Sequence, residues 1–311
     1  MATFISQRYI PAMKSLRPST GAATLLIVAS AVSFGSISVL TVLVTGAGVP
    51  LITAMAWRYI LACMLLVAVV GSRSLRSFSR RRVAMLLLIG GFGQALITYL
   101  SLRALEYIPV GPLAFLFYTY PAWVALVAAI RRTESLTVTR ILALTLALAG
   151  VTVIVGAPMN ERLNPLGVTL ALFSAVLYSI YLPSLEHLQR GIPAAVSTLI
   201  LVAGAATSFT IAALFRGELC LPVGRSVWAN ILLLAIVSTV IAFFTLIKGL
   251  DILGPVRTSI IATVEPFFTA LLGATVLGNQ LTGTTLVGGV FIASAVVLIQ
   301  WTTARLAPTT A

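Results

Sequence analysis

The sequence has 311 residues, of which 59% are hydrophobic and only 9% carry a charge, and its mean hydropathy is +1.10. Soluble domains contain about 25% charged residues, so this composition excludes an ordinary soluble protein and indicates a membrane protein. The net charge of +13 would suggest nucleic-acid binding in a soluble chain. Here the basic residues gather between apolar runs, as in membrane loops, so we expect no nucleic-acid partner.

Ten apolar runs are long enough to cross the bilayer as helices, for which about 20 residues suffice. In chain order they cover residues 21–44, 52–70, 83–105, 110–130, 138–156, 166–186, 194–215, 228–250, 256–277 and 283–301. The first run follows three basic residues and resembles a signal peptide, but its 24 residues exceed the roughly 7–15 of a signal core. We therefore expect a retained helix and an all-α membrane protein with ten transmembrane helices.

Lys and Arg are distributed unequally if the spans alternate in direction. Fifteen lie on the side that holds the N-terminus, and four, Arg103, Arg162, Arg216 and Arg225, lie on the other. The positive-inside rule then places both termini in the cytoplasm. We expect a multi-pass protein of the cell inner membrane, with residues 1–20 and 302–311 as cytoplasmic segments.

The chain contains an internal duplication. The stretch ALEYIPVGPLAFLFYTYP at 104–121 aligns without a gap with GLDILGPVRTSIIATVEP at 249–266, 145 residues later. Ser30-Ala31-Val32 likewise recurs as Ser174-Ala175-Val176, and Gly48-Val49-Pro50 as Gly191-Ile192-Pro193. Each half, 21–156 and 166–301, contains five spans, and a second copy of an odd-numbered unit enters the membrane from the opposite face. The sequence predicts two inverted five-helix repeats.

Inverted repeats indicate a class of function. Two copies of one unit can adopt different conformations and exchange them, which opens a central site to one side of the membrane and then to the other. The duplication therefore predicts a secondary transporter that works by alternating access on a small-molecule substrate.

Several short motifs sit at matching places in these spans. They are Trp57-Arg58-Tyr59-Ile60-Leu61-Ala62, Tyr120-Pro121-Ala122-Trp123-Val124-Ala125-Leu126, Glu134-Ser135-Leu136-Thr137, Gly150-Val151 and Glu265-Pro266-Phe267. Together they resemble the EamA family of the drug/metabolite transporter superfamily over nearly the whole chain. The second copy departs from the pattern, with Asn279-Gln280 in place of Glu134-Ser135. The resemblance implies a metabolite carrier, and bacterial members of this size resemble exporters of amino acids, aromatic ones included. Carriers of drugs, sugars or nucleotide-related metabolites remain the alternatives.

Glu265 is the one acidic residue well inside a span, where a charge costs about 2.5–3.5 kcal/mol and is usually kept for a function. We expect it to bind a proton or the ammonium group of a substrate; a neutral carboxyl bonded to a neighbouring helix is the alternative. Pro121 and Pro266 are candidate hinges, or static kinks. Arg58 could attract a substrate carboxylate, or could play a structural part by reaching the interface or pairing with Glu106.

The remaining candidates are hydroxyl, amide and aromatic side chains that could orient a zwitterion while accepting an apolar side chain. They are Ser33, Phe34, Ser36, Gln94, Thr98, Tyr99, Tyr118, Tyr178, Tyr181, Phe243, Ser259 and Thr263. Each is also an ordinary packing residue type, so a purely structural part is the alternative for any one of them.

Other classes of function fit less well. With one histidine and seven acidic residues, six of them at helix ends or in loops, neither a catalytic constellation nor a metal site can be assembled, so we expect no enzyme, metal or cofactor. A channel or a receptor-like protein stays open, although no repeated filter sequence is present. Proton coupling, or none, and a monomer or a homodimer are compatible with the sequence. The spans at 138–156 and 283–301 are almost devoid of polar groups, so we expect them to form a scaffold or a dimer-facing surface.

Overall fold

The computed structural model describes residues 19–71, 78–104, 107–108, 113, 116–133, 136–155, 163–278 and 283–306, and every regular element in these ranges is a helix. Six helical runs there are long and apolar enough to cross a membrane, and four shorter apolar helices complete the ten expected spans. The fold is therefore an all-α membrane fold of ten transmembrane helices in two inverted five-helix repeats.

The first repeat holds α1 (Thr20–Gly46), α2 (Leu51–Val70), a third span of α3 (Arg80–Met85), η2 (Leu86–Gly93) and α4 (Gln94–Ala104), then α6 (Tyr120–Ile130) and α7 (Val138–Val155). The second holds α8 (Pro165–Gln189), α9 (Ala194–Phe215), α10 (Arg225–Ala235), η3 (Ile236–Ile241), α11 (Ala242–Ala262), α12 (Glu265–Leu277) and α13 (Gly283–Leu306). The eighth span combines α10, η3 and the first part of α11. A kink at Gly254, where φ is 75°, then turns α11 into the ninth span.

Local signals in the sequence set several of these boundaries. The side chains of Ser19 and Asn164 accept hydrogen bonds from backbone N–H groups in the first turns of α1 and α8, and so cap them. The repeated Gly-x-Pro turns behave alike in both halves. Gly48 and Gly191 adopt positive φ, and the following prolines at 50 and 193 are the N-caps of α2 and α9. The two repeats thus enter their second helices by the same turn.

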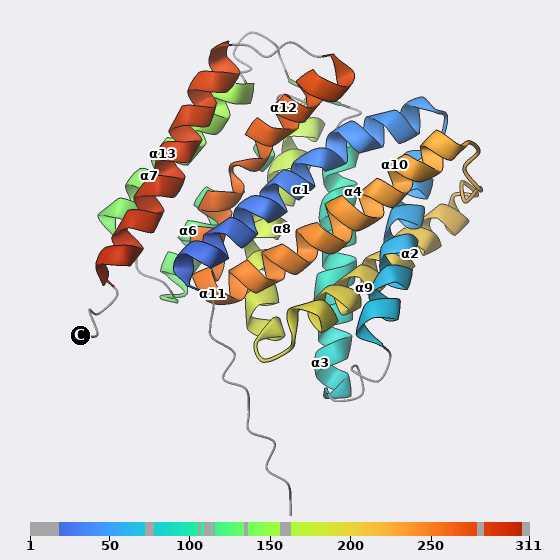
Figure 1. Cartoon of the computed structure of the whole chain (residues 1–311), viewed down its shortest axis with the longest axis horizontal. Coiled ribbons are helices and arrows are strands. Elements are labelled where there is room, and N and C mark those ends of the chain that lie inside the picture. The colour runs from blue at the N-terminus through green and yellow to red at the C-terminus, as the bar shows by residue number, and fades with distance from the viewer. Residues whose placement is uncertain are drawn as a thin grey trace, which may run out of the picture.

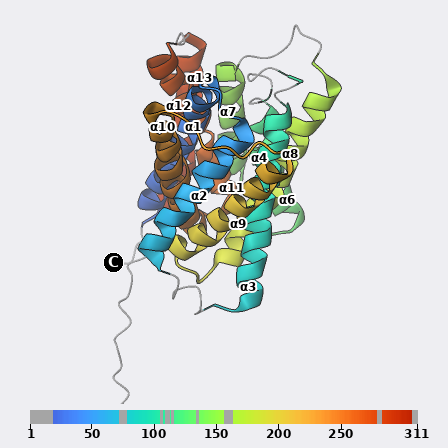
Figure 2. The same ribbon diagram turned by 90° about the vertical axis from the view of Figure 1, so that its right-hand side faces the viewer.

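Helix pairing is symmetric between the repeats. The α1 helix packs on α11 and α12, and its counterpart α8 packs on α4 and α6. Two further pairs, α2 with α9 and α7 with α13, each join a helix to its own counterpart, and they stand at opposite ends of the molecule (Figure 1, and turned in Figure 2). The central helices α1 and α8 lie between these pairs, which is where the repeats meet.

The fourth and ninth spans are broken, although the runs at 110–130 and 256–277 predicted continuous helices. A turn at Tyr118 and Thr119 precedes α6, and a turn at Thr263 and Val264 separates α11 from α12. The cause lies in the repeated proline, since Pro121 and Pro266 lack a backbone N–H and fit best in the first turn of a new helix. The ninth span therefore consists of two half-helices, and α6 begins at the matching place in the fourth span.

The third and eighth spans contain π-helical segments, which the apolar pattern did not predict. The 145-residue offset places η2 over residues 231–238, so η2 and η3 overlap in the aligned repeats. A π turn leaves its carbonyl groups out of the regular helical pattern and is frequent at functional sites. These segments mark matching irregular places in the two copies.

The pair α7 and α13 forms one edge of the fold. Gly150 of α7 lies so close to α13 that an added Cβ would be 2.6 Å from Ile292 and 2.7 Å from the Gly288 carbonyl oxygen. Small residues allow such close approach in a bilayer, where apolar burial drives little helix association. This pair supports the expected scaffold, and its use as a dimer surface stays a prediction.

Candidate functional site

Glu265 is the first residue of α12, at the break in the ninth span. Its side chain is partly buried rather than sealed off. The residue 145 positions earlier is Tyr120, the first residue of α6, and the Glu265 carboxylate and Tyr120 hydroxyl lie near enough to interact electrostatically. The first residues of α6 and α12 therefore lie near each other at the junction of the repeats.

Tyrosines surround this carboxyl group. The Tyr118 hydroxyl faces it as a hydrogen-bond donor, and Tyr178 also lies within electrostatic range. The Tyr120 and Tyr178 rings meet edge to face with centroids 4.7 Å apart, and Tyr178 stacks on Tyr181 at 5.7 Å. The Phe117 ring completes the group, 5.5 Å from Tyr120. We call these five aromatic residues with Glu265 the junction site.

The junction site has the chemistry to bind a cation with an adjoining apolar group. A carboxylate attracts an ammonium ion, and faces of tyrosine rings add cation–π attraction. The starts of α6 and α12 also bring the partial positive ends of two half-helices to the same depth. Discontinuous helices of this kind form substrate sites in transporters built from inverted repeats.

Arg58 does not belong to the junction site. It is buried between α2 and η3, where its Nε donates to Thr239 Oγ1 at 2.6 Å and its Nη2 donates to the Ser238 carbonyl oxygen at 2.7 Å. In the described part of the chain no carboxylate contacts it, while Glu106, its predicted partner, lies outside the described residues. These contacts favour the structural part over substrate binding.

Four expected lining residues instead lie at the contact between α1 and the eighth span. Ser36 Oγ lies 2.7 Å from Ser238 Oγ, and the Phe34 and Phe243 rings meet edge to face with centroids 5.1 Å apart. Ser33 is buried one turn earlier, and its carbonyl oxygen accepts from Ser36 Oγ at 2.6 Å. The structure thus brings predicted site residues together where two helices pack. We call such a contact, between the first helix of one repeat and the π-helical span of the other, a seam.

The other expected residues are not among the members of these two groups, although Thr263 lies in the turn just before Glu265. On α4, Gln94 Nε2 donates to Thr98 Oγ1 at 3.3 Å, Gln94 Oε1 has no partner among the described residues, and Tyr99 is exposed. Ser259 and Thr263 are fully buried, and their hydroxyls donate to carbonyl oxygens one turn earlier in α11. Contact with substrate remains a prediction for all five.

Sequence reasoning missed Tyr120 and Phe117. The signal for Tyr120 was present, because the ungapped repeat aligns it with Glu265 and each residue precedes a matching proline. Phe117 had no such signal, since its place in the junction site depends on how its ring packs against tyrosines of other segments.

Comparisons with known proteins agree with this architecture. The EamA-like transporter family matches residues 21–156 and again residues 165–301. A solved crystal structure, described only as "Crystal structure of protein", is 20% identical, covers 93% of this chain and 100% of its own, and superposes with a TM-score of 0.78. That likeness concerns the fold alone, and the comparison with curated proteins found no match. The repeated family match spans most of the sequence, and the chain belongs to the EamA-like transporter family of the drug/metabolite transporter superfamily.

Proposed function

We propose that this transporter exports amino acids, aromatic ones included, across the cell inner membrane by alternating access. The observation that carries the proposal is the junction site: a carboxyl group ringed by tyrosines where the two repeats meet. An amino acid presents an ammonium group, a carboxylate and a side chain. The Glu265 carboxylate complements the first, the positive end of the α6 half-helix complements the second, and the tyrosine rings suit an apolar third.

Glu265 would also couple transport to a proton gradient. A carboxyl group in this position can hold either a proton or the substrate ammonium, and each excludes the other. Proton entry from the outside would then release an amino acid there, and the next amino acid bound on the cytoplasmic side would displace the proton. Pro121 and Pro266, at the starts of α6 and α12, are the proposed hinges, because the half-helices can tilt about breaks that already lack a backbone hydrogen bond.

The proposal is tested in proteoliposomes that contain the purified protein and unlabelled amino acids. Exchange of labelled phenylalanine, threonine and glutamate is followed with and without a pH gradient, for wild type, Glu265→Gln and Glu218→Gln. Glu218 is the matched control because it pairs with Arg216 at the end of α9, away from the junction site. We expect saturable exchange that responds to the gradient, and a loss of about 10-fold or more in Glu265→Gln, as for a hydrogen bond to a charged group.

The control should keep the wild-type rate and its response to pH. Saturable exchange that Glu265→Gln leaves unchanged would make this carboxyl structural and the carrier uncoupled. Absence of exchange for all three amino acids would remove the proposed cargo, and drugs, sugars and nucleotide-related metabolites would be tested next.

A further inference from the structure

A cavity of about 300 Å³ is lined by residues of α8, η2 and α4. This volume lies at the lower end of the range for small-molecule sites, which is about 300–1,000 Å³. None of its ten lining residues is charged, and only Tyr181 and Ser184 among them have polar side chains. The cavity therefore suits a hydrocarbon or aromatic group rather than a polar one.

The mouth of this cavity faces the bilayer side of the bundle. Leu88, Phe92 and Ile180, all in its wall, are 64, 55 and 50% exposed, and in a membrane protein such apolar side chains on spanning helices face lipid. The described contacts leave this side open, with no helix packed over it.

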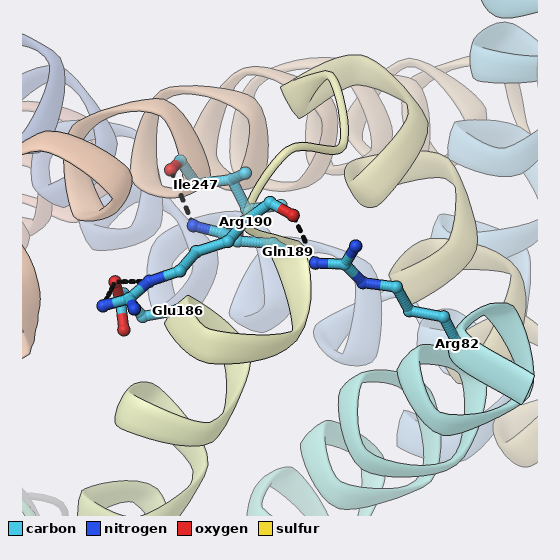
Figure 3. Close-up of polar contacts among 5 residues, drawn as sticks. All are labelled: Arg82, Glu186, Gln189, Arg190 and Ile247. Carbon is cyan, nitrogen blue, oxygen red and sulfur yellow. Dashed lines mark hydrogen bonds and ion pairs between the residues drawn. The ribbon is translucent and has the colours of Figure 1, made fainter. Parts of the chain in front are cut away.

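Polar contacts join the surrounding helices where α3 begins and α8 ends (Figure 3). Arg82 of α3 donates from Nε to the Leu188 carbonyl oxygen at 2.9 Å and from Nη2 to the Arg190 carbonyl oxygen. Gln189 Nε2 donates to the Ile247 carbonyl oxygen of α11 at 3.0 Å. The spans are thus tied at this end, and a hydrogen bond from Ser101 Oγ to Ser174 Oγ at 3.1 Å joins α4 and α8 again beyond the cavity.

One residue joins the cavity to the junction site. Tyr181 lines the cavity, and its ring also stacks on Tyr178, which lies beside Tyr120 and within electrostatic range of Glu265. The Tyr181 hydroxyl is buried and has no hydrogen-bond partner among the described residues. The cavity and the junction site are therefore neighbours that share Tyr181 as a common wall.

We propose that this cavity binds the apolar tail of the substrate, so that the transporter selects amphipathic amines. The proposal rests on the proposed function, because it uses Glu265 as the ammonium site. It adds that the substrate carries an apolar tail beside its ammonium group. The wall shared with the junction site favours a substrate tail over a lipid acyl chain, since a lipid tail has no use for the neighbouring Glu265 carboxyl.

The test uses n-alkylamines from butylamine to decylamine, with n-alkanols of equal length as uncharged probes. Binding to the folded state raises the midpoint of thermal unfolding of the purified protein in detergent, which reports the apparent affinity. The variant Ile180→Trp narrows the cavity at its rim. Phe173→Trp is the matched control, because Phe173 lies two turns earlier on the same side of α8, is 52% exposed and does not line the cavity. Partition of the probes into micelles is common to both variants.

For wild type and Phe173→Trp we expect the apparent amine affinity to rise about fourfold per methylene until the chain outgrows the cavity. Ile180→Trp should bind butylamine as wild type does and lose the rise for longer chains. Leu177→Ala, which enlarges the same cavity, should extend the rise to longer chains and keeps the test decisive if Ile180→Trp does not fold. Glu265→Gln should weaken amines at every length.

Equal behaviour of Ile180→Trp and Phe173→Trp at every length would overturn the proposal. So would alkanols that bind as tightly as amines with no effect of Glu265→Gln, because the cavity would then be a lipid site. A positive amine result without amino acid exchange in proteoliposomes would remove the proposed cargo and leave the cavity assignment intact.

Discussion

The two repeats make the same contact in different ways. The first helix of the first repeat, α1, lies against η3 and α11 of the second repeat. Contacts of Ser36 with Ser238 and of Phe34 with Phe243 close this seam. The first helix of the second repeat, α8, lies against η2 and α4 of the first repeat, and a cavity of about 300 Å³ lies between these helices. Equivalent helices thus pack closely at one seam and leave a local cavity at the other, although Ser101 Oγ and Ser174 Oγ still join α4 and α8 there at 3.1 Å. An exchange of these two arrangements is what alternating access through inverted repeats requires.

The π-helical segments of the two repeats are also held to their neighbouring helices in different ways. The η3 segment is held to α2 by the Arg58 side chain, which bonds to Thr239 and to the Ser238 carbonyl oxygen. The η2 segment contacts α9 through the backbone of Gly91 and Gly204 and through Gly90 against the Leu201 side chain. Matching irregular backbones are stabilised by a buried charge in one repeat and by close glycine packing in the other.

The largest expected effect comes from Gly91→Ala, which should force η2 away from α9. An added Cβ would lie 2.3 Å from the Gly204 Cα, and backbone atoms cannot move aside as a flexible side chain can. We expect a loss of about 3 kcal/mol or more in the free energy of unfolding, measured by denaturation in detergent. Gly93→Ala is the control on the same segment, because its Cβ would meet the Tyr181 ring at an ordinary 3.6 Å. Equal stability of the two variants would show that the helices are not held by this contact.

Arg58→Ala should break the corresponding contact of η3. It removes two hydrogen bonds and leaves a space in a buried region, so we expect a loss of about 2 kcal/mol in stability. Arg58→Lys should be intermediate, since an ammonium group lacks the planar fork that reaches both acceptors. Arg190→Ala is the control, because its side chain is 63% exposed in the pair with Glu186 and should contribute less than about 1 kcal/mol. An Arg58→Ala protein as stable as wild type would show that these hydrogen bonds do not stabilise the packing of η3 on α2.

Ser36→Ala and Ser238→Ala should have the smallest effect on stability and a specific effect on the seam. Each removes the shared hydrogen bond across the seam, of about 1 kcal/mol, which changes the ratio of closed to open seam by roughly fivefold, and Ser36→Ala also loses the bond to the Ser33 carbonyl oxygen within α1. In a double-mutant cycle the two losses should be non-additive, measured from unfolding midpoints and exchange rates. Strictly additive losses would mean that the hydroxyls do not act on each other.

The sequence alone predicts the spans, the inversion and the importance of Glu265, because each depends on a local or repeated signal. Apolar run length reports bilayer thickness, and an intact Glu-Pro pair is visible without a structure. The difference between the two seams could not be predicted this way. Aligned repeats look alike in sequence, whereas the positions of Phe34 against Phe243 and of Tyr181 beside an open space depend on how helices far apart in the chain pack. The π segments were missed for a related reason, since an inserted residue in the helical ladder leaves the apolar pattern nearly unchanged.

The most direct test of exchange between the seams locks the closed one. Ser36 Oγ and Ser238 Oγ are 2.7 Å apart, so cysteines at both positions should bring their sulfur atoms within bonding reach. The variant Ser36→Cys with Ser238→Cys is made in a background in which Cys63 and Cys220 are replaced by Ala, and amino acid exchange is measured in proteoliposomes before and after oxidation and after reduction. The account predicts exchange in the reduced protein, its loss on oxidation and its return on reduction. Oxidised protein that is fully cross-linked and still exchanges at the reduced rate would contradict it.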